Sequence, residues 1–252
     1  LRLSVWNATP QDIAGITRYI LHDLTTAERW PNIVWRHDGR PVLWVFSSID
    51  VTPQAFVRIR ETIRKAGHDP FVLFQAQLAG RQRTEEVVEA YLRVFDGVFI
   101  WGGGLENTRK MLELIAPVRD RIMAETGVRK HLVITAKPGH WRTEKGSMIR
   151  RRGTREFRHS LELAYRSGVD AVNIESWNDY SENHHVQVSM MNSTVMSDLC
   201  QYYGKRGTGE AFHAEPPGLY VSHRREILQG DMFSVEVLHL PTEGTRTREL
   251  RL

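Results

Sequence analysis

The chain has 252 residues, of which 41% are apolar and 25% are charged, and its formal net charge is +4. This share of apolar residues excludes a disordered chain, and 19 glycines without a periodic excess exclude a collagen-like one. No apolar stretch approaches the roughly 18 residues that span a bilayer, so we expect no membrane span. The single cysteine, Cys200, excludes an internal disulfide framework.

The basic residues argue against a nucleic-acid partner. Their densest run is 150–152, with Lys145 before it and Arg155 and Arg158 after it. Such a run is typical of a solvated loop and the start of a helix, whereas nucleic-acid binding calls for basic residues interleaved with aromatic ones. We therefore predict a solvated segment here, and recognition of an anionic polymer is the alternative.

Short apolar runs alternate with amphipathic segments along the chain. Runs rich in Val, Ile, Phe or Trp predict strands over residues 3–6, 42–46, 71–74, 97–101, 132–135 and 171–174. Between them, apolar positions at spacings of three and four predict helices over residues 53–66, 84–94, 107–126, 154–167 and 193–203.

This alternation predicts an α/β fold. Unbroken apolar runs in the strands indicate a parallel sheet that is buried on both faces. Six β/α units favour a TIM-type barrel over a doubly wound sheet, because no Gly-x-Gly-x-x-Gly follows the first strand. The glycines at 102–104 lack the spacing of a nucleotide site and predict a tight loop. Because residue 1 already lies in a strand and is not Met, we expect further sequence before it.

The composition changes after the last predicted helix, which we expect to end near Gly204. Residues 208–217 are rich in Gly, Pro and His and predict a linker. Two strand-like runs follow, at 218–222 and 232–238, and predict the start of a small β-sandwich. The predicted domains are a barrel over residues 1–209 and a linker with a partial β-rich domain over residues 210–252.

In a β/α barrel, the functional side chains lie at the carboxyl ends of the strands. Here those ends offer aromatic, amide and carboxylate groups and few cations. This set suits a neutral polyhydroxylated ligand such as a polysaccharide, because indole rings stack on sugars while amides and carboxylates bind hydroxyls. The candidate substrate-binding residues are Trp6, Asn7, Gln75, Gln77, Trp101, His140, Trp141, Trp177, Asn178, Tyr180 and His184.

The densest group of such residues contains Asp179 and Glu182, three residues apart. If the segment forms one helical turn, both carboxylates lie on the same side, about 5–6 Å apart at Cβ. Their repulsion and desolvation by Trp177 and Tyr180 would raise the pKa of at least one, so that one acts as general acid while the other stays ionised. The alternative is a helix N-terminus that Asn178 or Asp179 caps, with Glu182 completing a capping box.

Two other chemistries find less support. His184 and His185 suggest a metal site, but adjacent residues point to different sides of a regular element, and no second cluster has matching spacing. We therefore predict neither a metal nor another cofactor. Cys200 with a distant histidine is a weak candidate for a nucleophile pair, because it lies among apolar helix positions, where a small buried thiol is usual.

The residues around the carboxylate pair resemble those of two enzyme families. The run 177–182, Trp-Asn-Asp-Tyr-Ser-Glu, and the histidine after it resemble the Trp-Asn-Asp-Tyr-Gly-Glu-Ser-His segment of glycoside hydrolase family 71, the endo-α-1,3-glucanases. The related family 99 of endo-α-mannosidases has an acidic pair at the same spacing, in an Asn-Glu-Trp-His-Glu segment. Shorter matches lie at 39–42, 138–140, 198–203 and 208–209, so the resemblance runs from residue 1 to about 209.

This resemblance implies a (β/α)8 barrel whose third strand is residues 1–6, with the first two units before this chain or absent. It implies an endo-acting hydrolase of an α-linked polysaccharide, with Glu182 as general acid and Asp179 as the base that activates water or the sugar's own hydroxyl. Ser181 replaces the family's glycine. We expect a secreted, extracellular or periplasmic protein. The alternative is a non-catalytic glycan-binding or structural barrel, and the stereochemistry and oligomeric state stay open.

Overall fold

The computed structural model describes residues 2–4, 12–46, 51–76, 84–102, 104–142, 147–212, 218–223, 228–230 and 232–241. The chain forms two compact units, Leu1–Ile134 and Thr135–Leu252. The domain boundary predicted at residue 209 does not coincide with this division, and it stays a prediction. No helix in the described ranges is long and apolar enough to cross a membrane.

The first unit alternates strands and helices. Its parallel strands are β1 (Arg2–Ser4), β3 (Arg40–Phe46), β4 (Phe71–Gln75), β5 (Gly97–Ile100) and β6 (His131–Ala136), the end of which enters the second unit. A short strand, β2 (Arg36–His37), pairs antiparallel with β3. The helices are α1 (Ile13–Glu28), α2 (Pro53–Lys65), α3 (Glu85–Val94) and α4 (Leu105–Thr126). The predicted strands and helices of this region are confirmed over the residues that the structure describes, which exclude residues 5 and 6 of the first predicted strand. Helix α1 and strand β2 were not predicted.

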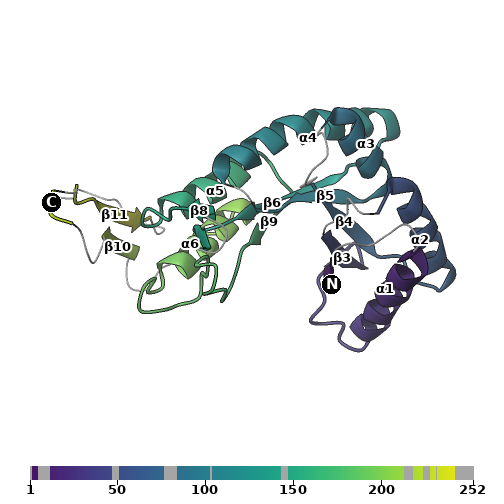
Figure 1. Cartoon of the computed structure of the whole chain (residues 1–252), viewed down its shortest axis with the longest axis horizontal. Helices are drawn as coiled ribbons and strands as arrows, with labels where there is room; N and C mark the ends of the chain where they lie inside the picture. The colour runs from purple at the N-terminus through teal and green to yellow at the C-terminus, as the bar shows by residue number, and fades with distance from the viewer. Residues whose placement is uncertain are drawn as a thin grey trace. The chain divides into compact units, whose positions relative to one another are not determined.

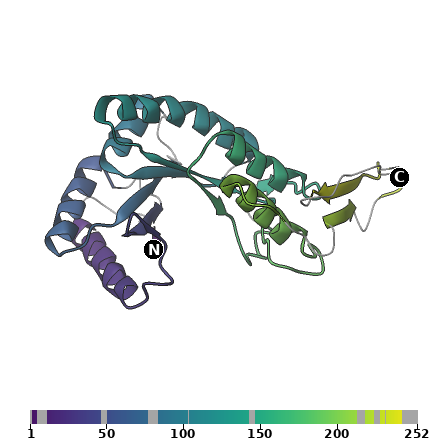
Figure 2. The same ribbon diagram turned by 180° about the vertical axis from the view of Figure 1, so that it is seen from behind.

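The topology of this unit is that of consecutive β/α units. The strands pair in the order β1-β3-β4-β5-β6, all parallel. Consecutive helices contact one another, α1 with α2, α2 with α3 and α3 with α4. They lie on one side of the strands (Figures 1 and 2). Helices of a doubly wound sheet would cover both faces, whereas those of a barrel all lie outside it, so the barrel winding is supported.

Helix α2 shows how local sequence produces these elements. The Thr52 hydroxyl accepts a hydrogen bond from the Ala55 N–H at 3.2 Å, and Pro53 follows the cap. Phe56, Ile59 and Ile63 are almost fully buried against the strands. Each such side chain contributes about 1.5–3 kcal/mol of hydrophobic stabilisation, so one apolar face fixes the helix on the sheet.

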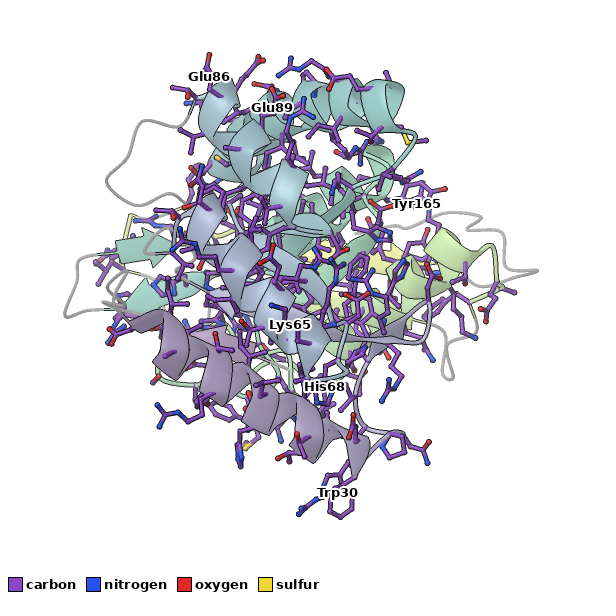
Figure 3. The ribbon with its side chains drawn as sticks, turned by 90° about the vertical axis from the view of Figure 1, so that its right-hand side faces the viewer. Trp30, Lys65, His68, Glu86, Glu89 and Tyr165 are labelled. Atoms are coloured by element: carbon purple, nitrogen blue, oxygen red, sulfur yellow. The ribbon has the colours of Figure 1, made fainter. Side chains whose placement is uncertain are left out.

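The outward faces of the helices carry charge. Glu86 and Glu89 lie on the outer side of α3 (Figure 3). Hydrogen bonds from Arg121 and Arg93 lower the pKa of Glu89. The Arg93–Glu89 pair lies within α3, whereas the Arg121–Glu89 pair links α3 to the neighbouring α4.

The second unit consists of the remaining elements. They are β7 (His140–Arg142), β8 (Ser147–Ile149), α5 (Arg155–Arg166), β9 (Ala171–Ile174), α6 (Val195–Thr208), β10 (Gly218–His223) and β11 (Val235–Leu240). β9 lies beside β6, and the Glu175 N–H after it donates to the Ala136 carbonyl at 3.0 Å. β7 and β8 form an antiparallel hairpin that the sequence analysis did not predict.

β10 and β11, which were predicted as strands, form an antiparallel hairpin on helices α5 and α6. Leu240 of β11 belongs to the same buried cluster as Phe157 and Leu199 of these helices. Glu236 accepts a hydrogen bond from the Thr154 N–H at 2.7 Å and pairs with Arg158 at 2.7 Å. The hairpin therefore shares its core with the helices that support the site.

Candidate functional site

Asp179 and Glu182 lie in a turn between β9 and α6. The helix N-terminus considered for this segment is wrong, because α6 begins only at Val195. Asp179 Oδ1 accepts hydrogen bonds from the Glu182 N–H at 3.1 Å and from Ser181 Oγ at 2.7 Å. Ser181, where family 71 has glycine, therefore adds a hydroxyl that holds the Asp179 carboxylate.

The two carboxylates converge on one histidine. His184 Nε2 lies 3.4 Å from Asp179 Oδ2 and 3.1 Å from Glu182 Oε2, so these two oxygens are at most about 6.5 Å apart. The His184 side chain is only 3% exposed. The expectation that both carboxylates lie on the same side of one turn is thus met in the structure.

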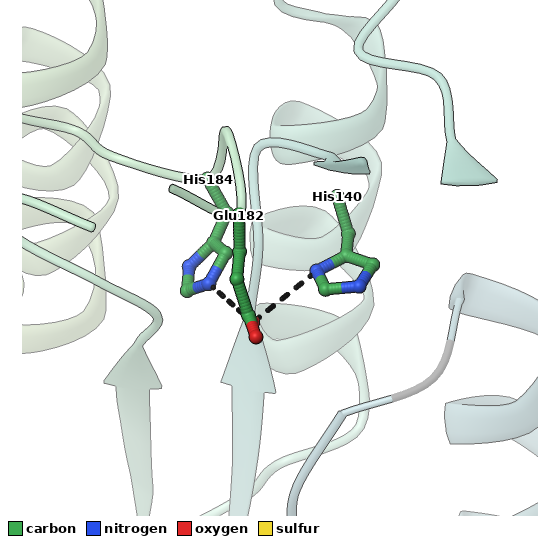
Figure 4. A group of neighbouring side chains, drawn as sticks. All are labelled: His140, Glu182 and His184. Carbon is green, nitrogen blue, oxygen red and sulfur yellow. Dashed lines mark hydrogen bonds and ion pairs between the residues drawn. The ribbon is translucent and has the colours of Figure 1, made fainter. Parts of the chain in front are cut away.

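Glu182 also connects the turn to the β7–β8 hairpin. Arg142 donates to Glu182 Oε1 at 2.9 Å, and His140 Nδ1 lies 3.5 Å from Glu182 Oε2. The two histidines therefore face the same carboxylate oxygen (Figure 4). The Trp141 N–H donates to the Glu182 carbonyl at 2.9 Å, so backbone and side-chain contacts hold the same two elements together.

A buried ion pair lies beneath this group. Lys137 follows β6, Glu175 follows β9, and Lys137 Nζ lies 2.9 Å from Glu175 Oε1. The same oxygen is 3.9 Å from His184 Nε2. Among the described residues, the other oxygen, Glu175 Oε2, is buried without a hydrogen-bond partner. Carboxyl ends of adjacent parallel strands therefore bring these charges together, as expected for a barrel-type site.

Arg151 corrects the expectation of a wholly solvated basic run. Its guanidinium donates to the carbonyls of Asn183 at 2.9 Å and His185 at 3.1 Å, and to Asn192 Oδ1 at 2.7 Å. Burial lowers the pKa of Arg151 to about 10. One side chain thus holds the segment that follows the carboxylate pair, while Arg150 and Arg152 are solvated as predicted.

Gly139 allows this arrangement because it has no side chain. A Cβ at this position would lie 2.5 Å from Arg151 Cγ and 3.0 Å from the Ile149 carbonyl oxygen. The first distance is shorter than any ordinary contact. Glycine therefore lets the backbone that enters β7, and with it His140, pass against the stem of Arg151.

The electrostatics of the site differ from the expectation for Asp179. Burial raises its pKa, but the hydrogen bonds from Ser181 and the Glu182 N–H, together with nearby His184, outweigh burial and lower the pKa below its ordinary value of 3.8. Burial, aided by Lys137, also lowers the pKa of His140. Near neutral pH, Asp179 is therefore ionised and His140 is a neutral imidazole.

The aromatic residues of the site present open faces and do not enclose the carboxylates. Trp141, Trp177 and Tyr180 are 54%, 57% and 55% exposed. The Tyr180 ring packs on His185 with centroids 4.3 Å apart, and its hydroxyl donates to Gln187 Oε1 at 2.8 Å. The exposed indole rings of Trp141 and Trp177 are therefore free to stack on a sugar ring.

Comparison with known proteins identifies the fold. No family model and no curated protein matches the chain. Two structures of the GH99 endo-α-mannosidase from Bacteroides thetaiotaomicron, one in complex with bis-tris propane, match with TM-scores of 0.62 at 14% and 13% identity. Both matches cover 82% of this chain, and they cover 69% and 65% of the mannosidase chain. A glycoside hydrolase-like protein matches with a TM-score of 0.51 at 15% identity, over 75% of this chain and 60% of the other.

The fold is glycoside hydrolase-like. It is an α/β fold with a parallel sheet, consistent with part of a TIM-like barrel. The likeness to family 99 is supported at the level of fold, and these structures show none to family 71. The chain spans 60–69% of the length of these three structures.

The predicted site residues fall into three groups. Those in the second unit that surround the turn are Asp179, Glu182, His140, Trp141, Trp177, Asn178, Tyr180 and His184. In the first unit, Gln75 is buried at the end of β4 and Trp101 packs edge-on against Phe46. Trp6, Asn7 and Gln77 lie outside the described residues.

Four charged residues of the site were not singled out as site residues from sequence: Lys137, Arg142, Arg151 and Glu175. Lys137 and Glu175 each stand directly after an apolar strand, which is a usable signal. Arg142 and Arg151 carry no such signal, because their partners lie about 30 to 40 residues away in the chain.

Proposed function

We propose that the chain carries the catalytic site of an endo-acting glycoside hydrolase that cleaves an α-linked glycan, with α-mannan and α-1,3-glucan as candidate substrates. One observation carries the proposal. Asp179 and Glu182 converge on His184 Nε2 after β9, in a chain whose fold is glycoside hydrolase-like. Paired carboxylates are the usual means of glycosidic bond cleavage.

The two carboxylates take different roles. Asp179, with its lowered pKa, is the base that activates water or the sugar's own hydroxyl. Glu182 delivers a proton to the leaving oxygen from Oε2, while Oε1 stays on Arg142. His184 Nε2, 3.1 Å from Oε2, is placed to return that proton. The exposed faces of Trp141 and Trp177 stack on sugar rings.

The separation of the carboxylates bears on stereochemistry. Inverting enzymes hold their carboxyl groups about 6.5–9.5 Å apart to admit a water, whereas retaining enzymes hold them about 5–5.5 Å apart. The upper limit of about 6.5 Å between Asp179 Oδ2 and Glu182 Oε2 leaves little room for that water. We therefore propose net retention, in which Asp179 activates the sugar's own hydroxyl in the first displacement and water attacks only in the second. It is measured as the anomer that forms first, by proton NMR during hydrolysis.

The test is the release of reducing ends from α-mannan and α-1,3-glucan by the full chain. We expect Asp179→Asn and Glu182→Gln each to lower turnover by at least about a hundredfold, the usual minimum for a general acid or base. Glu210→Gln is the matched control, because it neutralises an exposed carboxylate after α6 that accepts a hydrogen bond from the Thr208 hydroxyl at 2.9 Å. Unchanged turnover in both site variants would refute the assignment.

A second candidate is a glycan-binding chain without turnover. One observation favours it: both oxygens of Glu182 are engaged by protein groups, Arg142 on one and two histidines on the other. In this case glycan binding persists in Glu182→Gln, no reducing ends appear, and Trp177→Ala weakens the binding. Measurable hydrolysis by the unaltered chain would exclude it.

A further inference from the structure

Three side chains of the site present nitrogen and oxygen donors to one point. They are His140, Glu182 and His184, and the three donor atoms lie within 4.8 Å of one another. Both imidazole rings are turned toward the carboxylate of Glu182 (Figure 4). We propose that these three side chains bind one divalent transition-metal ion, with Zn²⁺ as the best fit.

Two of the three distances between the donors match the coordination sphere of zinc. Zinc bonds to nitrogen and oxygen are about 2.0–2.1 Å long, so the donors of a tetrahedral site are about 3.3 Å apart. Glu182 Oε2 lies 3.1 Å from His184 Nε2 and 3.5 Å from His140 Nδ1. The donors of the two histidines lie within 4.8 Å of each other, so the imidazoles would move toward each other when an ion binds.

Asp179 lies beside this group and is not one of its donors. Its Oδ2 lies 3.4 Å from His184 Nε2, but among the described residues the donor atoms that all lie within 4.8 Å of one another are those of His140, Glu182 and His184. The Asp179 side chain is 37% exposed, more than those of the three donors. The fourth position of the ion is therefore left to a water or another incoming ligand.

The protein holds the donors in place before any ion binds. Arg142 fixes Glu182 through Oε1 at 2.9 Å and leaves Oε2 for the ion, the kind of outer contact that orients metal ligands. The Trp141 N–H bond to the Glu182 carbonyl fixes β7, which carries His140. Among the described residues, His140 Nδ1 is buried without a hydrogen bond, although it lies 3.5 Å from the carboxylate. A metal bond would satisfy this nitrogen.

Charge and donor type favour zinc over other ions. Three carboxylates, Glu175, Asp179 and Glu182, lie around the two imidazoles together with the two cations Lys137 and Arg142. Mg²⁺ and Ca²⁺ prefer all-oxygen sites, whereas two imidazoles and a carboxylate suit Zn²⁺ and Co²⁺. The site therefore discriminates between these classes of ion.

Metal binding does not rest on the proposed hydrolysis, but it would act on it. An ion on Glu182 Oε2 occupies the oxygen that delivers the proton to the leaving group. We therefore expect Zn²⁺ to inhibit turnover and chelation to restore it. The two proposals can be refuted separately. If the chain binds zinc but hydrolyses no glycan, only the proposed hydrolase function is refuted. If it hydrolyses glycan but binds no zinc, only the metal site is refuted.

The test is calorimetric titration of the full chain with ZnCl2 after treatment with EDTA and dialysis. We expect one zinc per chain, no uptake of Mg²⁺, and the strong visible absorption of four-coordinate Co²⁺ when cobalt is used. Removing one ligand in His140→Ala or Glu182→Gln should weaken zinc binding by at least about tenfold. His159→Ala is the control, since this histidine is exposed on α5. This variant should bind zinc with the same affinity as the unaltered chain.

Folding and binding are separated in the same experiment. Far-UV circular dichroism establishes that each variant is folded, and zinc should raise the Tm of the unaltered chain and of His159→Ala but not of His140→Ala. Unchanged zinc affinity in folded His140→Ala and Glu182→Gln would overturn the proposal. An equal loss in His159→Ala, or equal binding of Mg²⁺, would do the same.

Discussion

Among the described residues, a group of charges lies at one end of the strands in each unit. The group of the first unit is partly buried at the amino ends of its strands, and the group of the second unit is buried at the carboxyl ends. In the first unit, Asp96 precedes β5 and binds Arg40, at the start of β3, and Arg60 of α2. In the second unit, Lys137 and Glu175 follow the strands β6 and β9. Residues at the amino ends of barrel strands generally serve stability, and residues at the carboxyl ends serve chemistry.

The two groups differ in how completely they are paired. Asp96 accepts from Arg60 through both oxygens, from Arg40 through Oδ1 and from the Val72 N–H through Oδ2. In the described part of the second unit, by contrast, Glu175 Oε2 and ring nitrogens of His140 and His184 are buried without hydrogen bonds. Within the described residues, Arg60 Nε of the first group is also buried without a hydrogen bond, so the difference lies in the carboxylates. The Asp96 carboxylate is bonded through both oxygens and stabilises the fold, whereas the unbonded oxygen of Glu175 and the histidine nitrogens cost stability and stay available for a ligand.

The largest effect is expected from Lys137→Met. The two side chains of its ion pair are 9% and 4% exposed, so the variant leaves a buried, uncompensated Glu175 carboxylate. The free energy of unfolding should fall by about 3–5 kcal/mol, as for other broken buried pairs. Urea unfolding at pH 7 measures it, and adding Glu175→Gln should recover much of the loss. A loss below about 1 kcal/mol would show that the charge is solvated.

A smaller loss of stability, with no loss of function, is expected from Asp96→Asn. The amide keeps the shape but removes the charge that binds Arg40 and Arg60, whose side chains are 28% and 12% exposed. Hydrogen bonds to charged groups are worth about 1.5–3 kcal/mol, and the free energy of unfolding should fall by about that amount. Zinc affinity and glycan turnover per folded molecule should stay unchanged. A changed zinc affinity with unchanged stability would reverse the contrast between the two groups.

The smallest effect concerns Cys200, which belongs to neither group. Burial raises the pKa of its thiol from 9.0 to about 11. The unfolded chain ionises first, so the contribution to stability is full below pH 9 and is lost as the pH rises toward 11. At pH 8, iodoacetamide should label the folded chain about a hundredfold more slowly than the urea-unfolded chain, since only the thiolate reacts. Equal labelling rates for the folded and unfolded chains would show that the Cys200 thiol is exposed to water in the folded chain.

Sequence patterns predict most of the framework because strands and helices follow from apolar spacing. Helix α1 was missed, although Ile16, Ile20 and Leu24 are buried at helical spacing. Asp179 and Glu182 were found because their relation is local, three residues within one turn. Arg142 and Arg151 were not, since their roles depend on contacts across about 30 to 40 residues. The pKa direction of Asp179 also depends on hydrogen bonds that only the folded turn provides.

The close approach of Gly139 to Arg151 also restricts which residues can occupy position 139 in relatives of this chain. The stem of Arg151 fills the space that a Cβ at position 139 would need. A side chain at position 139 would displace Arg151, and the segment 183–192 would lose the hydrogen bonds that its guanidinium donates. In relatives that keep arginine at position 151, glycine should therefore be kept at position 139.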